Sequence, residues 1–288
     1  MIDIKVMKVL TSVVNNPVFI EIQHHTLRKY MPGDYEFIVF NDAKPFSDFT
    51  NGGDPSLVDQ ISQVCQQLGI KCIPVPNLHQ VSMDCPVVRC QEAMNFMYEY
   101  MKQNIDEYLI IDSDMFPVDN INIDRYREYD CAIVLQHRDY VKPFEYLWNG
   151  LFYFNMHKMD NLDSIRWDKC FNSDVGGMTH EWLKNKCNDL PTVYAIRNGN
   201  QLPYHRAGIY FIRHLWSLTW NDKEMPEKFE NTQLARFIRE DPRNNNNCYF
   251  CEIYDDTFLH YRAGGDWQRR GLIFHNELTN KLKNVLVK

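Results

Sequence analysis

Apolar residues along the first 117 positions follow two alternating patterns, short apolar runs and longer amphipathic segments. The short runs predict strands at residues 4–14, 36–40, 71–75 and 108–111. Between them, apolar side chains recur every three or four positions and predict three helices, which begin at Pro17, after the cap at 54–55, and at Pro86. Strands that alternate with helices indicate an α/β fold with a mainly parallel, twisted sheet flanked by helices.

Polar residues lie at the ends of these predicted strands. A loop at 11–16 follows the first strand, Asn41 and Asp42 follow the second, and Asp112 and Asp114 follow the fourth. Because the loops after parallel strands gather at one edge of a sheet, a nucleotide could lie across all three. No glycine-rich phosphate motif follows the first strand, so a metal and cations from elsewhere in the chain must neutralise the phosphate charge.

Asp112 and Asp114 are separated by a single serine, Ser113, directly after the apolar run. If the strand geometry persists, positions i and i+2 share a face, so both carboxylates can reach one ligand. Two crowded carboxylates need a cation or a proton between them, and a divalent ion that also binds a diphosphate fits that position. The alternative interpretation is an ordinary polar turn after a core strand, since aspartate and serine are common in turns.

The second half of the chain is less regular. Its predicted elements are strands at 131–135, 151–155 and 209–212, a loop at 174–177 before a helix at 178–188, and a tail helix at 272–287. No repeat or low-complexity linker divides the sequence. We therefore expect one domain, 1–288, with a nucleotide-binding half at about 1–117 and a second half at about 118–288.

Composition and charge exclude several classes of protein. The chain has 288 residues, 44% of them hydrophobic and 24% charged, with a net charge of −7, and no strongly basic run predicts nucleic-acid binding. No stretch approaches the ~20 apolar residues of a membrane span, so no transmembrane segment is expected. Nine scattered cysteines without a signal peptide predict reduced thiols and a cytoplasmic location. The oligomeric state is not determined by the sequence.

Two sequence motifs, and their order along the chain, resemble those of the GT-A glycosyltransferases, which are metal-dependent enzymes that use nucleotide sugars. The first is Asp112-Ser113-Asp114, and the second is the stretch 257–267, which contains His260 and a Gly-Gly-Asp-Trp end. The resemblance implies a GT-A-like α/β domain that transfers a hexosyl or pentosyl group from a UDP-sugar to a hydroxyl of a carbohydrate acceptor. In such a domain residues 118–288 form the acceptor-side half with its smaller subregion, and 149–155 resembles a turn that leads into a strand beside the acceptor. It also implies that Asp112, Asp114 and His260 bind the metal; the alternative for His260 is a buried core histidine.

The expected cofactor is Mn²⁺ or Mg²⁺, and an imidazole ligand favours Mn²⁺. The expected contacts with the nucleotide sugar, beside the metal ligands, are Thr11, Ser12, Val13, Asn41, Asp42, Arg89, Ser113, Gly264, Gly265, Trp267 and Arg269. Glycines allow the backbone to approach phosphates closely, and arginines, with Arg262 and Arg270 as further candidates, oppose phosphate charge. His137 and Arg138 follow a strand end and are candidates for the sugar pocket.

Asp174 is the candidate catalytic base, because it lies in a glycine-rich loop and could deprotonate an acceptor hydroxyl. It could equally cap the following helix or accept a hydrogen bond from a sugar, and Glu181 is a substitute base. Two other functions stay open. A nucleotidyltransferase shares a similar half-sheet but usually has a glycine-rich loop after the first strand. A catalytically silent nucleotide- or carbohydrate-binding protein is the other alternative.

Overall fold

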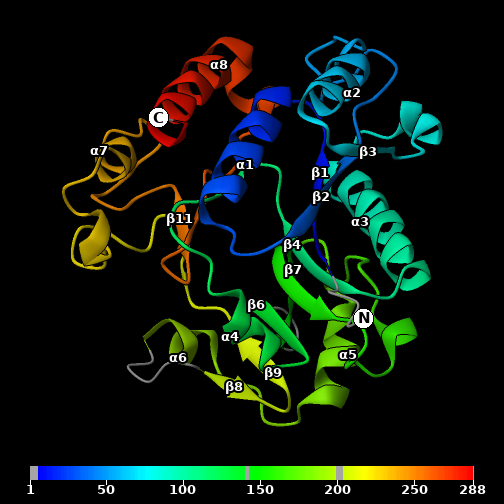
Figure 1. Cartoon of the computed structure of the whole chain (residues 1–288), viewed down its shortest axis with the longest axis vertical. Coiled ribbons are helices and arrows are strands. Elements are labelled where there is room, and N and C mark those ends of the chain that lie inside the picture. The colour runs from blue at the N-terminus through cyan, green and yellow to red at the C-terminus, as the bar shows by residue number, and fades with distance from the viewer. Residues whose placement is uncertain (1–5, 140–142, 199–203, 288) are drawn as a thin grey trace.

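The computed structural model describes residues 6–139, 143–198 and 204–287, so residues 4 and 5 of the first predicted strand lie outside it. An eight-stranded sheet crosses the centre of the molecule (Figure 1). In spatial order its strands are β3 (Lys71–Pro74), β2 (Tyr35–Asn41), β1 (Met7–Val13), β4 (Glu107–Ile111), β7 (Phe144–Asn155), β6 (Cys131–Arg138), β9 (Ile209–Phe211) and β8 (His205–Arg206).

Six of these strands run in one direction. The neighbours β3, β2, β1 and β4 pair in parallel, as do β6 and β9, whereas β7 and β8 run antiparallel to their neighbours. The predicted α/β fold with a mainly parallel sheet is therefore confirmed. The loops after β1, β2 and β4 meet at the same edge of the sheet, as expected for parallel strands.

The helices of the first half are α1 (Pro17–Tyr30), α2 (Leu57–Leu68) and α3 (Pro86–Gln103). Asn16 caps α1 as predicted, because its side chain accepts a hydrogen bond from the amide of Val18. The predicted cap at 54–55 is wrong. Ser56 is the cap residue of α2, and the Asp54 carboxylate instead accepts from the amide and hydroxyl of Ser56 in the preceding turn.

A second, antiparallel sheet lies beside the first and has the strand order β10 (His214–Leu215), β11 (Glu252–Tyr254), β12 (Phe258–His260) and β5 (Met115–Pro117). Strand β5 begins directly after Asp114 and pairs with β12, so that Met115 lies opposite His260. This pairing joins the two sequence motifs, which are far apart along the chain.

The remaining helices are α4 (Ile123–Arg127), α5 (Thr179–Lys186), α6 (Val193–Asn198), α7 (Gln233–Arg239) and α8 (Trp267–Leu286), and short 3₁₀ turns cover Leu78–Ser82, Leu162–Ser164 and Glu227–Phe229. Gly271, with φ of 75°, interrupts α8, so the predicted tail helix is its longer part. The turn at 149–150 that the resemblance implies is not found, since both residues lie within β7. The Trp148 ring covers Gly150 so closely that a Cβ atom there would lie 2.3 Å from it.

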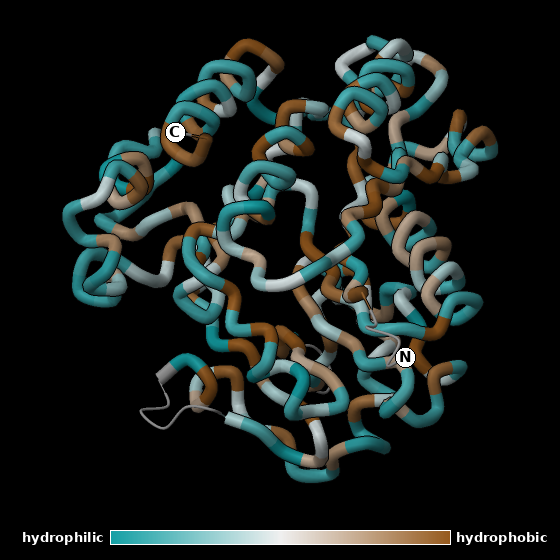
Figure 2. Tube along the Cα trace, viewed as in Figure 1, coloured by the Kyte–Doolittle hydropathy of each residue, from teal (hydrophilic) through white to brown (hydrophobic). Residues whose placement is uncertain are grey.

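Strand β4 is apolar from Tyr108 to Ile111, and both faces of this part are buried. Leu109 and Ile111 face one hydrophobic core, and Tyr108 and Ile110 face another on the opposite side of the sheet. Figure 2 shows hydrophobic residues along these central strands. No helix in the described ranges combines the length and apolar character needed to cross a membrane.

Candidate metal and nucleotide site

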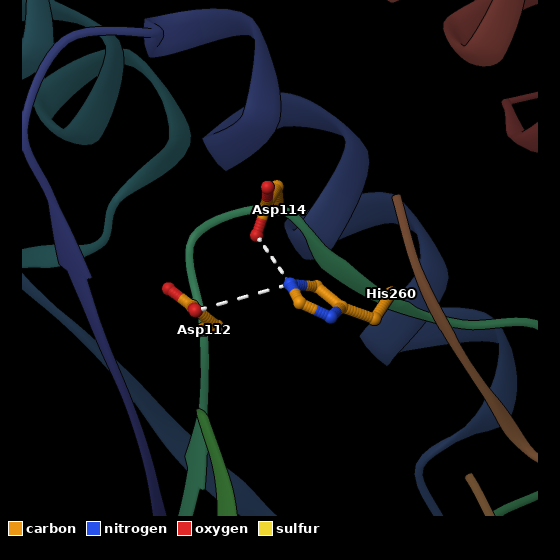
Figure 3. A group of neighbouring side chains, drawn as sticks. All are labelled: Asp112, Asp114 and His260. Atoms are coloured by element: carbon orange, nitrogen blue, oxygen red, sulfur yellow. Dashed lines mark hydrogen bonds and ion pairs between the residues drawn. The ribbon is translucent and has the colours of Figure 1, made fainter. Parts of the chain in front are cut away.

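Asp112, Asp114 and His260 meet just beyond the end of β4 (Figure 3). Nε2 of His260 lies 3.1 Å from Oδ1 of Asp114 and 3.9 Å from Oδ2 of Asp112. Asp114 and His260 are buried, and Asp112 is half-buried. The predicted convergence of the three side chains is therefore found.

His260 is oriented by Glu252 of the neighbouring strand. The two residues are paired in register, and Nδ1 of His260 lies 2.7 Å from Oε2 of Glu252. Glu252 is itself fixed, because it accepts hydrogen bonds from the Tyr254 hydroxyl and the Ser217 amide. Metal-binding histidines commonly have such a carboxylate on the ring nitrogen that does not bind the metal. This arrangement favours the ligand interpretation of His260 over the core interpretation.

Burial and neighbouring charges shift the pKa values of His260, Asp112 and Asp114. Burial alone would lower the pKa of His260, but the charges of Asp114 and Glu252 raise it to about 10. Burial, followed by the charge of Asp114, raises the pKa of Asp112 to about 7. Burial opposes ionisation of Asp114, yet the imidazolium of His260 holds the pKa of Asp114 below its usual value. The cluster thus needs positive charge at its centre, which a proton on His260 supplies and a bound cation could replace.

The donor set also fits a divalent ion. One ligand atom from each of Asp112, Asp114 and His260 lies within 4.8 Å of the other two. Ligands about 2.1 Å from an octahedral ion are about 3 Å apart when adjacent and about 4 Å apart when opposite. Two carboxylates and one imidazole suit Mn²⁺ better than Mg²⁺, which prefers oxygen ligands alone.

The backbone around Asp114 is held in place by several contacts. The Gly264 amide donates to Oδ2 of Asp114 over 2.7 Å, and a Cβ atom on Gly264 would lie 2.6 Å from the Phe19 ring. Gly264 therefore serves close packing against the metal cluster rather than contact with a pocket. On the other side, Gln23 donates to the backbone carbonyls of Asp112 and Met115 and so fixes the turn between them.

A buried arginine, Arg243, holds the loop after His260. It is paired with Asp241, and its guanidinium donates to the carbonyl oxygens of Tyr261 and Arg262. Arg262 and Ala263 both adopt positive φ, at 59° and 54°. Residues other than glycine enter this region at a cost in energy, and the contacts of Arg243 stabilise the loop there. The sequence analysis did not identify Gln23, Arg243 or Glu252. Glu252 had one signal in the sequence, because it is an acidic residue that stands directly before the apolar residues of a strand.

A pocket of about 550 Å³ extends from the metal cluster along the edge formed by β1, β2 and α3. Of the predicted nucleotide-sugar contacts, those that line this pocket are Ser12, Asp42, Arg89, Asp112, Ser113, Gly265, Trp267 and Arg269. Phe49 and Lys44 also line it and were not predicted. The pocket is thus lined by residues from the loops after β1, β2 and β4, which the sequence predicted to lie at one edge of the sheet.

Three predicted contacts lie behind the pocket wall instead. Thr11 and Val13 are fully buried, and the Thr11 hydroxyl faces the amide of Gln23. The Asn41 side chain donates to the Val58 carbonyl and so anchors α2. These residues support the edge of the sheet without lining the pocket, because alternate strand residues point to opposite faces.

The charged residues of this pocket are paired within the protein. The buried amine of Lys44 lies 2.9 Å from Oδ1 of Asp42, and burial, the largest effect, raises the pKa of Asp42 despite this partner. Arg89 is buried rather than on a solvated helix face, and its guanidinium lies 2.6 Å from the Asp48 carboxylate. Arg89 is therefore already neutralised. Arg270 is exposed and lines neither this pocket nor the adjoining one.

A second pocket of about 480 Å³ adjoins the first and shares Asp112, Ser113, Gly265 and other residues with it. Asp174 lines this second pocket together with Asp114 and His260. The helix-cap alternative for Asp174 is excluded, because α5 begins five residues later and Met178 is its cap residue. Glu181 is exposed and lines neither pocket. His137 is held between Glu145 and Asp139, whereas Arg138 and Arg262 line the second pocket.

Replacing Glu252 by glutamine is expected to weaken Mn²⁺ binding about 10- to 100-fold, because the neutral amide orients and polarises His260 less strongly. Calorimetric titration of Mn²⁺ in the presence of UDP measures this loss. Glu145→Gln is the matched control, since Glu145 contacts His137 outside both pockets. Unchanged Mn²⁺ affinity in Glu252→Gln would show that His260 does not depend on Glu252 for its orientation.

Comparison with solved structures finds similarity to the galactosyltransferase LgtC. For LgtC in complex with donor and acceptor sugar analogs, the TM-score is 0.35 at 11% identity, and the match covers 55% of this chain and 62% of that chain. For an active-site mutant of LgtC, the TM-score is 0.37 at 11% identity, with 55% and 61% covered. The chain thus spans less than two thirds of these structures. Neither a protein-family model nor a curated protein matches it. Similarity at this level carries no information about reaction or substrate.

Proposed function

We propose that this chain is a metal-dependent glycosyltransferase that moves a sugar from a nucleoside diphosphate sugar, a UDP-sugar, to a hydroxyl of a glycan. The observation that carries the proposal is the Asp112, Asp114 and His260 cluster at the junction of two pockets. A diphosphate bound at this junction would extend its nucleoside into the first pocket, which we call the nucleoside pocket, and its sugar into the second pocket. In this proposal residues 1–288 form one catalytic unit.

Asp112, Asp114 and His260 would hold Mn²⁺ in this site. The metal would stabilise the negative charge that develops on the departing diphosphate. The backbone at Gly265 and the side chain of Ser113 line both pockets and would contact the phosphates. Arg269 also lines the first pocket, but its guanidinium lies 3.1 Å from the Asp266 carboxylate, so its charge is already opposed within the protein.

The nucleoside pocket offers a matching set of groups for uracil. The hydrogen bonds of the Asp42 carboxylate to Lys44 and Asn77 use Oδ1, which leaves Oδ2 to accept the N3–H of the base. Phe49 adds an aromatic face to the same pocket. Cytosine has no hydrogen on N3, and a purine requires more room than a pyrimidine.

We therefore expect UDP to bind at least about tenfold more tightly than CDP in the presence of Mn²⁺, which corresponds to one hydrogen bond to a charged group. Calorimetric titration with UDP, CDP and GDP measures the order. Tighter binding of GDP would contradict the uridine assignment without affecting the metal site.

Turnover with a panel of nucleotide sugars and Mn²⁺ tests the proposed reaction. Slow release of sugar, or transfer to a glycan, supports a glycosyltransferase. Exchange of pyrophosphate into the nucleotide sugar would instead indicate a nucleotidyltransferase. Tight binding with no turnover of any donor would indicate a binding protein.

A further inference from the structure

One arginine in the second pocket has no side-chain partner among the residues that the structure describes. The pocket contains two arginines, Arg138 at the end of β6 and Arg262 after β12. Arg262 is engaged, because it donates to the Ser217 hydroxyl over 2.7 Å and lies 3.8 Å from Glu252. Arg138 forms no ion pair or side-chain hydrogen bond with any of the residues that the structure describes.

The carboxylates nearest to Arg138 in the sequence are already used. Asp139 and Glu145 both contact His137, at 2.9 Å and 3.1 Å. Residues 140–142, which follow Asp139 in the sequence, are tyrosine, valine and lysine and therefore include no acidic side chain. A half-buried guanidinium without a counter-charge is unusual, and a planar guanidinium pairs well with a carboxylate or a phosphate.

The surroundings of Arg138 are those of a sugar-binding surface. Gln136, two residues earlier on the same strand, accepts a hydrogen bond from the Tyr146 hydroxyl through Oε1, which leaves its NH₂ group to donate. Trp216 adds a half-buried aromatic ring to the pocket. Aromatic rings beside amide and charged groups are a combination that binds carbohydrates through ring faces and hydroxyls.

Arg138 lines the second pocket together with Asp174, and neither residue lines the nucleoside pocket. Tyr146, which donates to Gln136, also accepts a long hydrogen bond of 3.4 Å from the Asp174 amide. A sugar ring held by Gln136 and Arg138 would therefore present a hydroxyl to Asp174, the proposed base.

We propose that Arg138 binds an anionic group, a carboxylate or a phosphate ester, of the acceptor sugar. This inference rests on the proposed glycosyltransferase function and specifies its acceptor as an acidic sugar. Of the five acidic residues that line the pocket, Asp112, Asp114 and Glu252 surround His260, and Asp266 pairs with Arg269. Asp174 is the remaining one and lies on the side of Arg138, so a sugar whose anionic group binds Arg138 would present a hydroxyl to Asp174. One pyranose ring can carry both the anion and the reacting hydroxyl.

The test compares three methyl glycosides that differ in charge: methyl glucoside, methyl glucuronide and methyl glucoside 6-phosphate. Their affinities are measured by ligand-observed NMR with the full chain, UDP and Mn²⁺. We expect at least one anionic sugar to bind about tenfold more tightly than the neutral sugar, as for one hydrogen-bonded charge pair. Preference for the glucuronide assigns a carboxylate, and preference for the phosphate assigns a phosphate ester.

Variants identify the residue responsible. Arg138→Gln should remove the preference for the anionic sugar, and Arg138→Lys should retain part of it. Arg28→Gln is the matched control, because Arg28 is exposed on α1 outside both pockets, and it should keep the preference. UDP affinity should stay the same in all three variants, which also shows that they fold.

Several outcomes would overturn the proposal. Equal binding of the neutral and anionic sugars, no binding of any of them, or a preference that persists in Arg138→Gln would each do so. A preference of UDP-glucuronate over UDP-glucose that disappears in Arg138→Gln would assign the arginine to the donor sugar instead. Failure of UDP and Mn²⁺ to bind the unmodified chain would contradict the proposed function itself, and is measured separately from the sugar preference.

Discussion

Replacing Asp114 or His260 by alanine is expected to lower Mn²⁺-dependent turnover more than about 100-fold, since residues that only support metal ligands already cost 10- to 100-fold. Both residues are buried and lie 3.1 Å apart at the centre of the cluster. Neither alanine can bind a cation. The two variants should weaken UDP binding only when Mn²⁺ is present, because the nucleotide and the protein would share the same ion.

Mn²⁺ and UDP are therefore expected to bind cooperatively, each raising the affinity of the other by the same factor, about 5- to 150-fold for typical couplings. Calorimetric titrations of each ligand with and without the other measure this factor. His79→Ala is the control, because His79 is exposed and pairs with Glu92 outside the site. If His260→Ala bound UDP and Mn²⁺ as the unmodified chain does, His260 would be a core histidine and the function proposal would lose its main support.

Replacing Asp174 by asparagine is expected to lower the rate of transfer about 10²- to 10⁴-fold and to leave UDP affinity nearly unchanged. Asp174 lines the second pocket with His260 but does not line the nucleoside pocket. Its carboxylate accepts one hydrogen bond, from the Val175 amide to Oδ1, and asparagine preserves that contact while losing the ability to take a proton.

The measurement is the rate at saturating donor, combined with a UDP titration that reports on folding and nucleotide binding. Glu181→Gln serves as the control, because Glu181 is exposed and outside both pockets. Full activity of Asp174→Asn would remove this residue from the mechanism and would favour transfer with retention of the anomeric configuration, which needs no such base.

The sequence alone determined the features that depend on neighbouring residues. The apolar run that becomes β4 is followed at once by Asp112, Ser113 and Asp114, so the position of both carboxylates at a strand end was predictable from local pattern. The helices at Pro17 and Pro86 were predictable for the same reason, because caps and periodic apolar positions act within a few residues. The predicted cap of α2 at 54–55 was wrong, because the Asp54 side chain forms a turn with Ser56 and the helix begins after Ser56.

The tertiary structure alone decided which distant residues share the site. His260 and Asp114 are 146 positions apart, and only the pairing of β5 with β12 brings them into contact. The same holds for Glu252 behind His260, for Gln23 beneath the aspartates, and for Arg138, which has no side-chain partner in the described ranges. Strand pairing across such distances depends on the register and burial of whole elements, so residue type and spacing do not determine it. The local sequence supplied the two aspartates and the histidine, and the pairing of β5 with β12 in the second sheet brought them to one point.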